Sequence, residues 1–267
     1  MNSSNLNKNR KRMIILAIVA VTLIVVLIII AVIYSKIKGD IATGGMKINA
    51  FLSKHCSDPA VLDSKNFPWS FQFRLNWKDI RKEFDDYEKE FIVPSYKDIN
   101  KGISGGTEGW KALFLRAFNI DTKMMQYFPK TKELISKCPC TTAYFSMLEP
   151  GTHILEHRGV YKGVVRYHLG LIVPDDWENC FIVVDGNKLH WHEGKDVMFD
   201  DLFTHRVENN TKQARVVLFL DIKRDFNSFA IDIINTVMLK FIKCNDALLT
   251  TVKKADVLSR QTRRDIF

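Results

Sequence analysis

Between Thr141 and Asp221 the sequence alternates apolar and polar residues with a period of two, in short segments separated by turn residues. In the segment 164–173, for example, apolar side chains fall on one face, while Arg166 and His168 fall on the other. A period of two is that of a β-strand, whose successive side chains point to opposite faces. Several short strands joined by turns predict an antiparallel β-sandwich or β-barrel.

Helical periodicity occurs on both sides of this region. Trp77–Phe91 and Phe226–Leu249 place apolar residues three or four positions apart, with charged residues between them. This spacing predicts amphipathic helices that flank the β core. Trp110–Phe118 and Thr131–Lys137 are shorter predicted helices.

The segment Met13–Tyr34 contains no charged residue over 22 positions. A helix of that length, rising about 1.5 Å per residue, spans the roughly 30 Å hydrocarbon core of a bilayer. A cleaved signal peptide would have a shorter apolar region and a small-residue cleavage site, and the sequence contains neither. We therefore expect an uncleaved single-pass membrane anchor.

Basic residues give this anchor an orientation. Four of them precede it, within a basic tail at residues 1–12, and three follow it. The difference mildly favours a cytosolic N-terminus. We expect a type II membrane protein whose main domain lies on the non-cytosolic side.

Positive charge is concentrated near the two ends of the chain. Residues 1–47 and 240–267 carry +6 and +4 of the formal +9, which leaves −1 for the segment between them. This distribution fits a protein beside a membrane better than one that binds nucleic acid, and no nucleic-acid-binding motif is present. We divide the rest of the chain into a juxtamembrane linker at 35–68, a main domain at 69–225, and a C-terminal amphipathic helix with a basic tail at 226–267. That helix lies either on the membrane surface or, as we expect, across the barrel with a solvated tail.

The cysteines do not suggest a zinc site or a disulfide framework. Cys138 and Cys140 are too close in sequence for ordinary paired zinc ligands, and the odd total of five leaves at least one thiol unpaired. A single disulfide remains compatible with the sequence.

Histidines and arginines mark a candidate site in the β region. His157 ends the segment FSMLEPGTHILEH, and His205 follows the apolar run VMFDDLF. Two histidines 48 positions apart prove little by themselves, because a buried histidine is often only a hydrogen-bonded core residue. Arg166, His168 and Arg215, however, lie among apolar neighbours, where burial without a partner is costly. This pattern indicates a metal site with an anion-binding arginine beside it.

Several motifs in this order and spacing resemble the aspartyl/asparaginyl β-hydroxylases, a family of Fe(II)- and 2-oxoglutarate-dependent oxygenases. The resemblance covers roughly Trp110–Asp221, with weaker similarity upstream from Pro68. It rests on WKALFL, FSMLEPGTHILEHRG, RYHLGLIVP, the W-x-E-G turn at Trp191–Gly194, FDDLFTH and RVVLFLDI. Together these motifs are specific, although each one alone would be weak.

The resemblance implies a mainly β fold with a double-stranded β-helix core of the jelly-roll or cupin-like kind. It implies that His157 and His205 bind Fe(II). It also implies that 2-oxoglutarate is bound by Trp110, Ser146, Arg166, His168 and Arg215, with Arg215 and Ser146 on its distal carboxylate. These roles agree with the chemistry, because imidazole suits Fe(II) and a guanidinium fits a carboxylate with two parallel hydrogen bonds.

One position departs from the usual oxygenase pattern of two histidines and one carboxylate, commonly written H-x-D. The corresponding residue is Gly159, which would share the strand face of His157, whereas Glu156 would point to the opposite face. The resembled family lacks this carboxylate, so its absence agrees with the resemblance. We expect water at the open position and weaker iron binding than with a third ligand.

Other polar residues are weaker candidates. His190 and His192 form an H-x-H pattern that we expect to face outward beside a turn, and His153 lies in a turn with a structural or near-site role. Asp200 and Asp201 are expected to orient the loop before His205 rather than to bind iron. Asn209-Asn210-Thr211 matches a glycosylation sequon, which by itself does not establish a compartment.

The expected function is that of a membrane-anchored dioxygenase that couples decarboxylation of 2-oxoglutarate, with O2, to hydroxylation of a C–H bond. The substrate implied first by the resemblance is the β-carbon of an Asp or Asn side chain in a protein. One alternative is a fatty acyl chain of a membrane lipid, as in relatives that hydroxylate lipid A. A second is a non-catalytic membrane-tethered binding module, and a third is a metal-dependent cupin that leaves Arg215 and Ser146 without a role.

Overall fold

The computed structural model describes residues 11–14, 41–56, 59–243 and 246–262. The chain forms two units, Met1–Phe51 and Leu52–Phe267. Residues 11–14 are helical, and helix α2 (Ile41–Ser53) lies mostly in the first unit. No helix within the described ranges is long and apolar enough to cross a bilayer. Most of the predicted anchor, Met13–Tyr34, lies outside the described residues, so the anchor stays a prediction.

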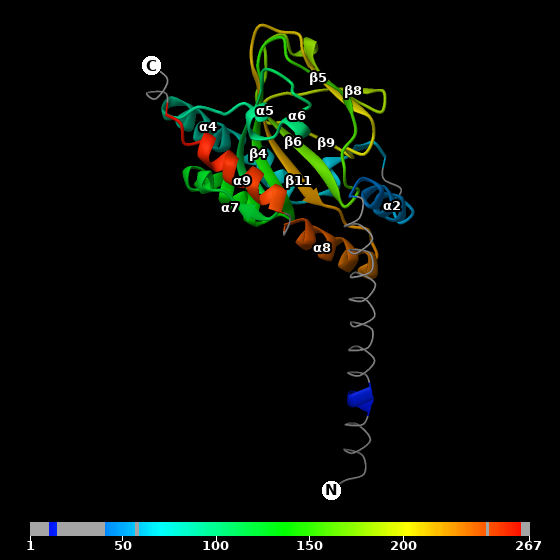
Figure 1. The fold of residues 1–267 in the computed structure, drawn as a ribbon. Helices are drawn as coiled ribbons and strands as arrows, with labels where there is room; N and C mark the ends of the chain where they lie inside the picture. Colours follow the sequence, from blue (N-terminus) through cyan, green and yellow to red (C-terminus); the bar gives the residue numbers. More distant parts are fainter. Residues whose placement is uncertain (1–10, 15–40, 57–58, 244–245, 263–267) are drawn as a thin grey trace. The chain divides into compact units, whose positions relative to one another are not determined.

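The second unit is built around two antiparallel sheets (Figure 1). The larger sheet has the strand order β1-β9-β6-β11-β4-β2-β3 and the smaller one β5-β10-β7-β8. The strands are β1 (Val61–Leu62), β2 (Trp110–Ala117), β3 (Ile120–Asp121), β4 (Cys140–Leu148), β5 (His153–His157), β6 (Val164–Ile172), β7 (Cys180–Val184), β8 (Asn187–His190), β9 (Asp196–Phe199), β10 (His205–Asn209) and β11 (Arg215–Lys223). From β4 to β11 the chain passes repeatedly between the two sheets, which is the expected jelly-roll arrangement.

Helices flank the larger sheet. They are α3 (Ser70–Leu75), α4 (Trp77–Glu90), α5 (Tyr96–Ile99), α6 (Lys101–Ser104), α7 (Pro129–Ser136), α8 (Phe229–Lys243) and α9 (Asp246–Leu258), with 3₁₀ turns at Ser64–Asn66, Lys123–Tyr127 and Trp177–Asn179. Helices α3, α4 and α7 pack on the outer face of this sheet, and α5 and α9 pack against its opposite face. Helix α4 buries Ile80, Phe84 and Tyr87, the apolar stripe of the predicted amphipathic helix. The Phe84 ring lies 4.9 Å from that of Phe145 in β4, so this stripe packs on the sheet.

Apolar side chains fill both faces of the larger sheet. One core, which includes Phe84, Phe145 and Leu218, lies between this sheet and the helices. A second core, which includes Ile182 and Val217, lies between the two sheets. Strands buried on both faces read as continuous apolar runs rather than as alternating patterns.

This burial explains the one incorrect element prediction. Trp110–Phe118 was predicted to be a short helix, but it forms β2, which pairs with β4 and β3. A short apolar run does not distinguish a buried helix from a buried strand by its period. Left-handed backbone at Phe118 and Asn119 (φ 50° and 62°) turns the chain back after β2. The prediction at Thr131–Lys137 is confirmed by α7.

The described structure also refines two segment boundaries. β1, within the predicted linker 35–68, pairs with β9 and belongs to the larger sheet. The predicted C-terminal helix, Phe226–Leu249, corresponds to two separate helices, α8 and α9.

Candidate metal and cosubstrate site

The two candidate metal ligands lie side by side on neighbouring strands of the smaller sheet. His157 in β5 is the register partner of His205 in β10, and their ring centroids are 4.2 Å apart. The Nδ1 of His157 lies 2.8 Å from the carbonyl oxygen of Leu155, and the Nδ1 of His205 lies 2.9 Å from that of Phe203. Because a carbonyl only accepts, each Nδ1 carries the proton and donates it. In the neutral form of each ring, Nε2 therefore keeps a lone pair, the form in which imidazole binds a metal.

The protonation state of His205 suits this role. Its side chain is buried, and burial lowers its pKa to about 4, with the Phe203 carbonyl opposing the shift. The imidazole is therefore neutral at physiological pH. His157, in contrast, is exposed at the end of an edge strand, which gives the pair a side open to solvent.

A pocket between the two sheets contains every predicted site residue. It is lined by Trp110, Tyr144, Ser146, Ile154, His157, Arg166, His168, Ile182, Phe199, His205, Val207, Arg215 and Phe219. The polar groups come from both sheets, and apolar side chains fill the space between them. Tyr144 was not singled out from the sequence, although it lies two residues before Ser146 and so shares its strand face.

Arg215 lies buried at one end of this pocket. Its guanidinium stacks on the Trp191 ring, 4.4 Å from the centroid, and its Nη1 donates a hydrogen bond to the Ser146 carbonyl oxygen over 3.2 Å. Its Nε is buried and has no hydrogen-bond partner. Burial lowers the pKa of Arg215, but an arginine keeps its charge at any physiological pH. The site therefore holds a desolvated cation with donor capacity to spare, which fits a carboxylate ligand.

His168 has the same unfilled hydrogen-bonding capacity. Both of its ring nitrogens are buried without a partner. Burial, and next the positive charges of Arg215 and Arg166, lower its pKa well below the usual value, so the ring is neutral. A neutral imidazole here can donate one hydrogen bond to an oxygen of a bound ligand.

Trp110 and Ser146 complete the Arg215 end of the pocket. The Trp110 Nε1 donates a hydrogen bond to Ser146 Oγ over 3.0 Å. Ser146 uses a lone pair in this contact, so its own hydroxyl proton is available to a carboxylate in the pocket.

Arg166, at the other end of the pocket, is held by two carboxylates. Its Nη2 lies 2.8 Å from Asp201 Oδ2, and its Nε donates to Asp221 Oδ1 over 3.1 Å. Burial alone would lower the pKa of Arg166, but Asp201 and Asp221 raise it above its usual value. The Arg166 guanidinium also stacks on the Phe219 ring at 4.4 Å.

The sequence did not indicate that Asp201, expected only to orient the loop before His205, pairs with Arg166 at this site. Burial raises its pKa to about 6, while Arg166 acts in the opposite direction. One carboxylate oxygen, Oδ1, is buried without a hydrogen-bond partner. Asp201 pairs with Arg166, which lines the pocket of His157 and His205, so its free carboxylate oxygen can orient water beside that pocket.

The structure corrects the expected surroundings of Gly159. β5 ends at His157, and a side chain added at position 159 would overlap the Asp201 carboxylate. The space beside Gly159 is thus occupied by a carboxylate from the loop between β9 and β10. The expected water at an open metal position stays a prediction. Within the described ranges, no group of three or more His, Cys, Asp or Glu is placed to hold a metal together.

The weaker candidates lie elsewhere. His190 and His192 contact the Trp177 ring, at centroid distances of 5.1 and 4.6 Å. Asp200 is buried and paired with Lys162 and Arg224, and it also accepts a hydrogen bond from the Leu202 backbone, which agrees with the expected role in the loop before His205.

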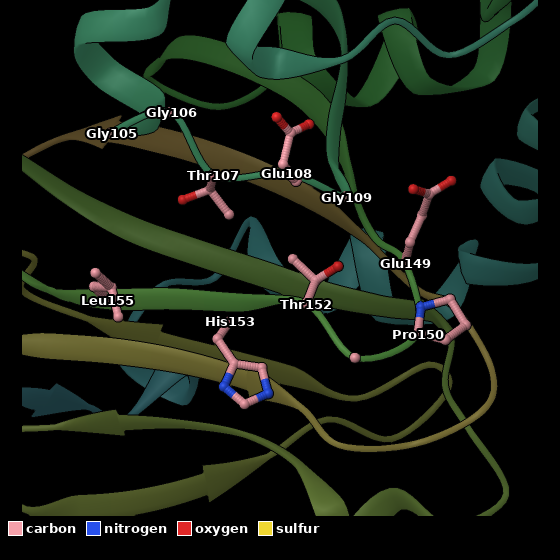
Figure 2. A pocket seen from close by; sticks show the side chains of 11 residues that line it. Gly105, Gly106, Thr107, Glu108, Gly109, Glu149, Pro150, Thr152, His153 and Leu155 are labelled. Atoms are coloured by element: carbon pink, nitrogen blue, oxygen red, sulfur yellow. The ribbon is translucent and has the colours of Figure 1, made fainter.

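A larger cavity, of about 510 Å³, lies on the other side of β5 (Figure 2). It is bordered by the glycine-rich loop 105–109 and by Glu149–His153, with Leu155 at one side. His153 and Leu155 border this cavity, whereas Ile154 and His157 line the histidine pocket. Glu108 pairs with Lys97 and Glu149 with Lys111, so both carboxylates already have a cation.

The family model of the aspartyl/asparaginyl beta-hydroxylases matches residues 74–225, more than half of the chain. The matched range contains both sheets from β2 onward and every residue that lines the histidine pocket. The chain therefore belongs to the aspartyl/asparaginyl β-hydroxylase family.

Individual relatives match parts of the chain. An ornithine lipid ester-linked acyl 2-hydroxylase from Rhizobium tropici is 39% identical over 177 residues, which are 64% of this chain and 63% of the relative. The human aspartyl/asparaginyl beta-hydroxylase is 36% identical over 100 residues, 35% of this chain and 13% of that protein. The chain thus spans less than two thirds of the length of either relative. A Cupin_2 domain of an Enterobacter cloacae transcriptional regulator covers 44% of this chain and all of that domain, at 13% identity and a TM-score of 0.32, too low to support a further argument.

Proposed function

We propose that this hydroxylase-family protein is an Fe(II)- and 2-oxoglutarate-dependent dioxygenase. The observation that carries the proposal is the pairing of two features in one pocket. Two histidine rings lie 4.2 Å apart at one place, each with its Nδ1 beside a carbonyl oxygen, and buried nitrogens of Arg215 and His168 lack partners at another. A dicarboxylate that reaches from a metal to a buried guanidinium satisfies both.

In this proposal each residue has a defined task. His157 and His205 hold the iron through Nε2. Arg215 and the Ser146 hydroxyl bind the distal carboxylate of 2-oxoglutarate, while Trp110 fixes the Ser146 hydroxyl by its hydrogen bond. Arg166 and His168 stabilise negative charge nearer the metal. Apolar side chains such as Ile182, Phe199 and Phe219 exclude water between these groups.

When bound, iron and 2-oxoglutarate would supply the oxidation: one oxygen atom of O2 enters succinate as CO2 leaves, and the other is inserted into a substrate C–H bond.

Two substrate classes remain, and the relatives support them differently. A fatty acyl chain of a membrane lipid is supported by the acyl 2-hydroxylase, because that match extends over 177 residues. The β-carbon of an Asp or Asn side chain is supported by the family and by the shorter match to the human protein. We propose the acyl chain first, because that match extends over more of the chain. A non-catalytic module would not need the arrangement of His157, His205 and Arg215.

We also propose that Met13–Tyr34 anchors the protein in a membrane as a single-pass, type II segment, with the catalytic domain on the non-cytosolic side. The proposal rests on its 22 uncharged residues and the basic residues before it. Full-length protein is expected to stay in the membrane pellet after carbonate extraction. Its release into the supernatant would contradict the anchor.

Catalysis is tested with the full-length protein in lipid vesicles, supplied with Fe(II), 2-oxoglutarate and O2. Succinate release is measured with ornithine-containing lipids and, separately, with Asp- and Asn-containing peptides. We expect release to depend on iron and to rise with one substrate class. Absence of both 2-oxoglutarate binding and turnover would contradict the dioxygenase proposal.

A further inference from the structure

Helix α8 exposes large apolar side chains along one face. Phe229 is 84% exposed, Ile233 38% and Phe241 39%. These residues are four, eight and twelve positions apart, so they lie on one side of the helix. Contiguous apolar surface of this kind usually marks an interaction site in a soluble domain.

The opposite face of α8 is fixed to the β core. Ile231, Asn235 and Leu239 are buried there, again at intervals of four. The Asn235 side-chain amide donates hydrogen bonds to the Gly163 carbonyl oxygen over 2.9 Å and to the Arg224 carbonyl oxygen over 3.2 Å. A buried polar residue that is satisfied in this way sets the rotation of the helix. The Asn235 hydrogen bonds therefore fix the orientation in which Phe229 and Ile233 point away from the β core.

Helix α8 also adjoins the Arg166 end of the histidine pocket. Arg166 pairs in register with Asp221 of β11. The Asn235 side chain of α8 bonds to Gly163 and Arg224, which are three residues along the chain from Arg166 and Asp221, about 10 Å at the usual strand rise. The loop that leaves His157 is tied to the helix, because the Tyr161 hydroxyl donates a hydrogen bond to Asn235 Oδ1 over 2.8 Å. A membrane or protein that binds the exposed face of α8 would therefore lie near the Arg166 end of the histidine pocket.

Charge and chain length indicate a bilayer as the partner. Residues 240–267 carry +4, and Lys240 of α8 is exposed. The one acidic residue of α8, Asp232, accepts a hydrogen bond from the Phe226 backbone. Seventeen residues separate Tyr34, the end of the uncharged segment, from Leu52, the start of the second unit. Fully extended, a segment of that length would reach at most about 60 Å, and helix α2, which includes residues 41–51 of it, makes it shorter. An anchor in the bilayer would therefore keep the second unit within reach of the membrane surface.

We propose that the apolar face of α8 lies on the membrane, with Phe229 and Ile233 inserted at the boundary between headgroups and acyl chains. Amphipathic helices with basic flanks bind in this way, at a depth of about 5–10 Å. The inference rests on the proposed anchor. If the proposed acyl substrate is correct, contact of α8 with the membrane also directs the Arg166 end of the histidine pocket toward the lipid.

The test replaces single residues of the full-length protein with the photoreactive residue p-benzoylphenylalanine. The test positions are Phe229 and Ile233. Phe71 and Leu75 of α3, which are 55% and 64% exposed, are matched controls. Val25, within the uncharged segment, reports insertion of the anchor. The protein is reconstituted into vesicles of phosphatidylcholine and phosphatidylglycerol with a radiolabelled acyl chain, and is then irradiated.

We expect lipid adducts at positions 229 and 233 at least about ten-fold above those at 71 and 75. In a second variant, Phe229→Glu is combined with the photoreactive residue at 233, and the adduct at 233 is expected to fall several-fold while the thermal midpoint of unfolding is unchanged. Adducts at Val25 but not at 229 or 233 would overturn the proposal, as would protein–protein adducts at 229, which would indicate a second copy. Absence of lipid adducts at all positions, including Val25, would overturn both the docking and the anchor. Because cross-linking needs no turnover, its outcome is independent of the proposed chemistry.

Discussion

The Gly159 backbone donates a hydrogen bond to the Asp201 carbonyl oxygen over 2.6 Å, and the Asp201 carboxylate fills the space that a side chain at position 159 would need. If Gly159 corresponds to the carboxylate position of an H-x-D motif, that position is closed here by a carboxylate from another loop. That carboxylate is also an ion-pair partner of Arg166.

This contact predicts that Gly159→Ala is costly. The added methyl group must displace Asp201, and such overpacking typically costs about 1–3 kcal/mol of unfolding free energy. Gly102→Ala is the matched control, because a Cβ there meets only Asn100 Oδ1 at 3.4 Å. Chemical denaturation of both variants measures the difference. In an Asp201→Ala background the cost of Gly159→Ala is expected to shrink; an equal cost in both backgrounds would contradict the steric explanation.

Asp201 also predicts a pH dependence. Its pKa is raised to about 6 in the folded state from an ordinary value of 3.8. Between these values the folded state binds more protons than the unfolded state, so the contribution of this carboxyl to stability decreases as pH rises through about 6. The stability of Asp201→Asn relative to the parent should therefore improve between pH 4 and pH 7. Denaturant titrations at both pH values measure it, and a constant difference would contradict the shifted pKa.

The next prediction concerns the contribution of buried Arg215 to the affinity for 2-oxoglutarate. Removing one member of a buried charge-assisted pair costs about 2–5 kcal/mol, which is roughly 30-fold to several-thousand-fold in affinity. We expect Arg215→Ala to lose that much affinity, and Arg215→Lys to recover only part of it, because an ammonium cannot make the two-pronged contact. Anaerobic calorimetry with Mn(II) in place of iron provides the measurement. Equal affinity in the parent and both variants would remove Arg215 from the cosubstrate site.

The paired histidines predict where metal binds. His157→Ala and His205→Ala should each abolish iron-dependent turnover and weaken Mn(II) binding, while the fold is retained because both side chains line a pocket. His190→Ala is the control, since His190 contacts Trp177 instead. Normal succinate release by either variant would exclude that histidine as a ligand.

The buried ion cluster around Asp200 predicts a large effect on stability rather than on chemistry. Asp200 pairs with Lys162 and Arg224, and all three side chains are buried. Asp200→Ala would remove a buried carboxylate that both cations contact, at a cost of about 3–5 kcal/mol. The thermal midpoint should fall by about 6–20 °C. Asp86→Ala, which removes exposed pairs with Lys82 and Lys89, should leave the midpoint unchanged. Similar midpoints for both variants would contradict a stabilising role of the Asp200 ion cluster.

The sequence alone determined the features that are local or repeat with a fixed period. The period of two after Thr141 predicted antiparallel strands, and the stripe of α4 predicted an amphipathic helix, because both patterns follow from where successive side chains point. The motifs around His157 and His205 were enough to indicate the family. The uncharged segment Met13–Tyr34 is likewise evident from composition, and its anchor role remains to be measured.

Only the tertiary structure decided the contacts between distant segments. Trp110–Ala117 became a strand because both of its faces are covered, which a short apolar run does not reveal. Asp201 reached the space beside Gly159, and Trp191 came to lie under Arg215, through pairing of strands far apart in the chain. The outward face of α8 was set by the Asn235 hydrogen bonds to the β core. Such arrangements depend on packing among many residues at once, and therefore leave no periodic trace in the sequence.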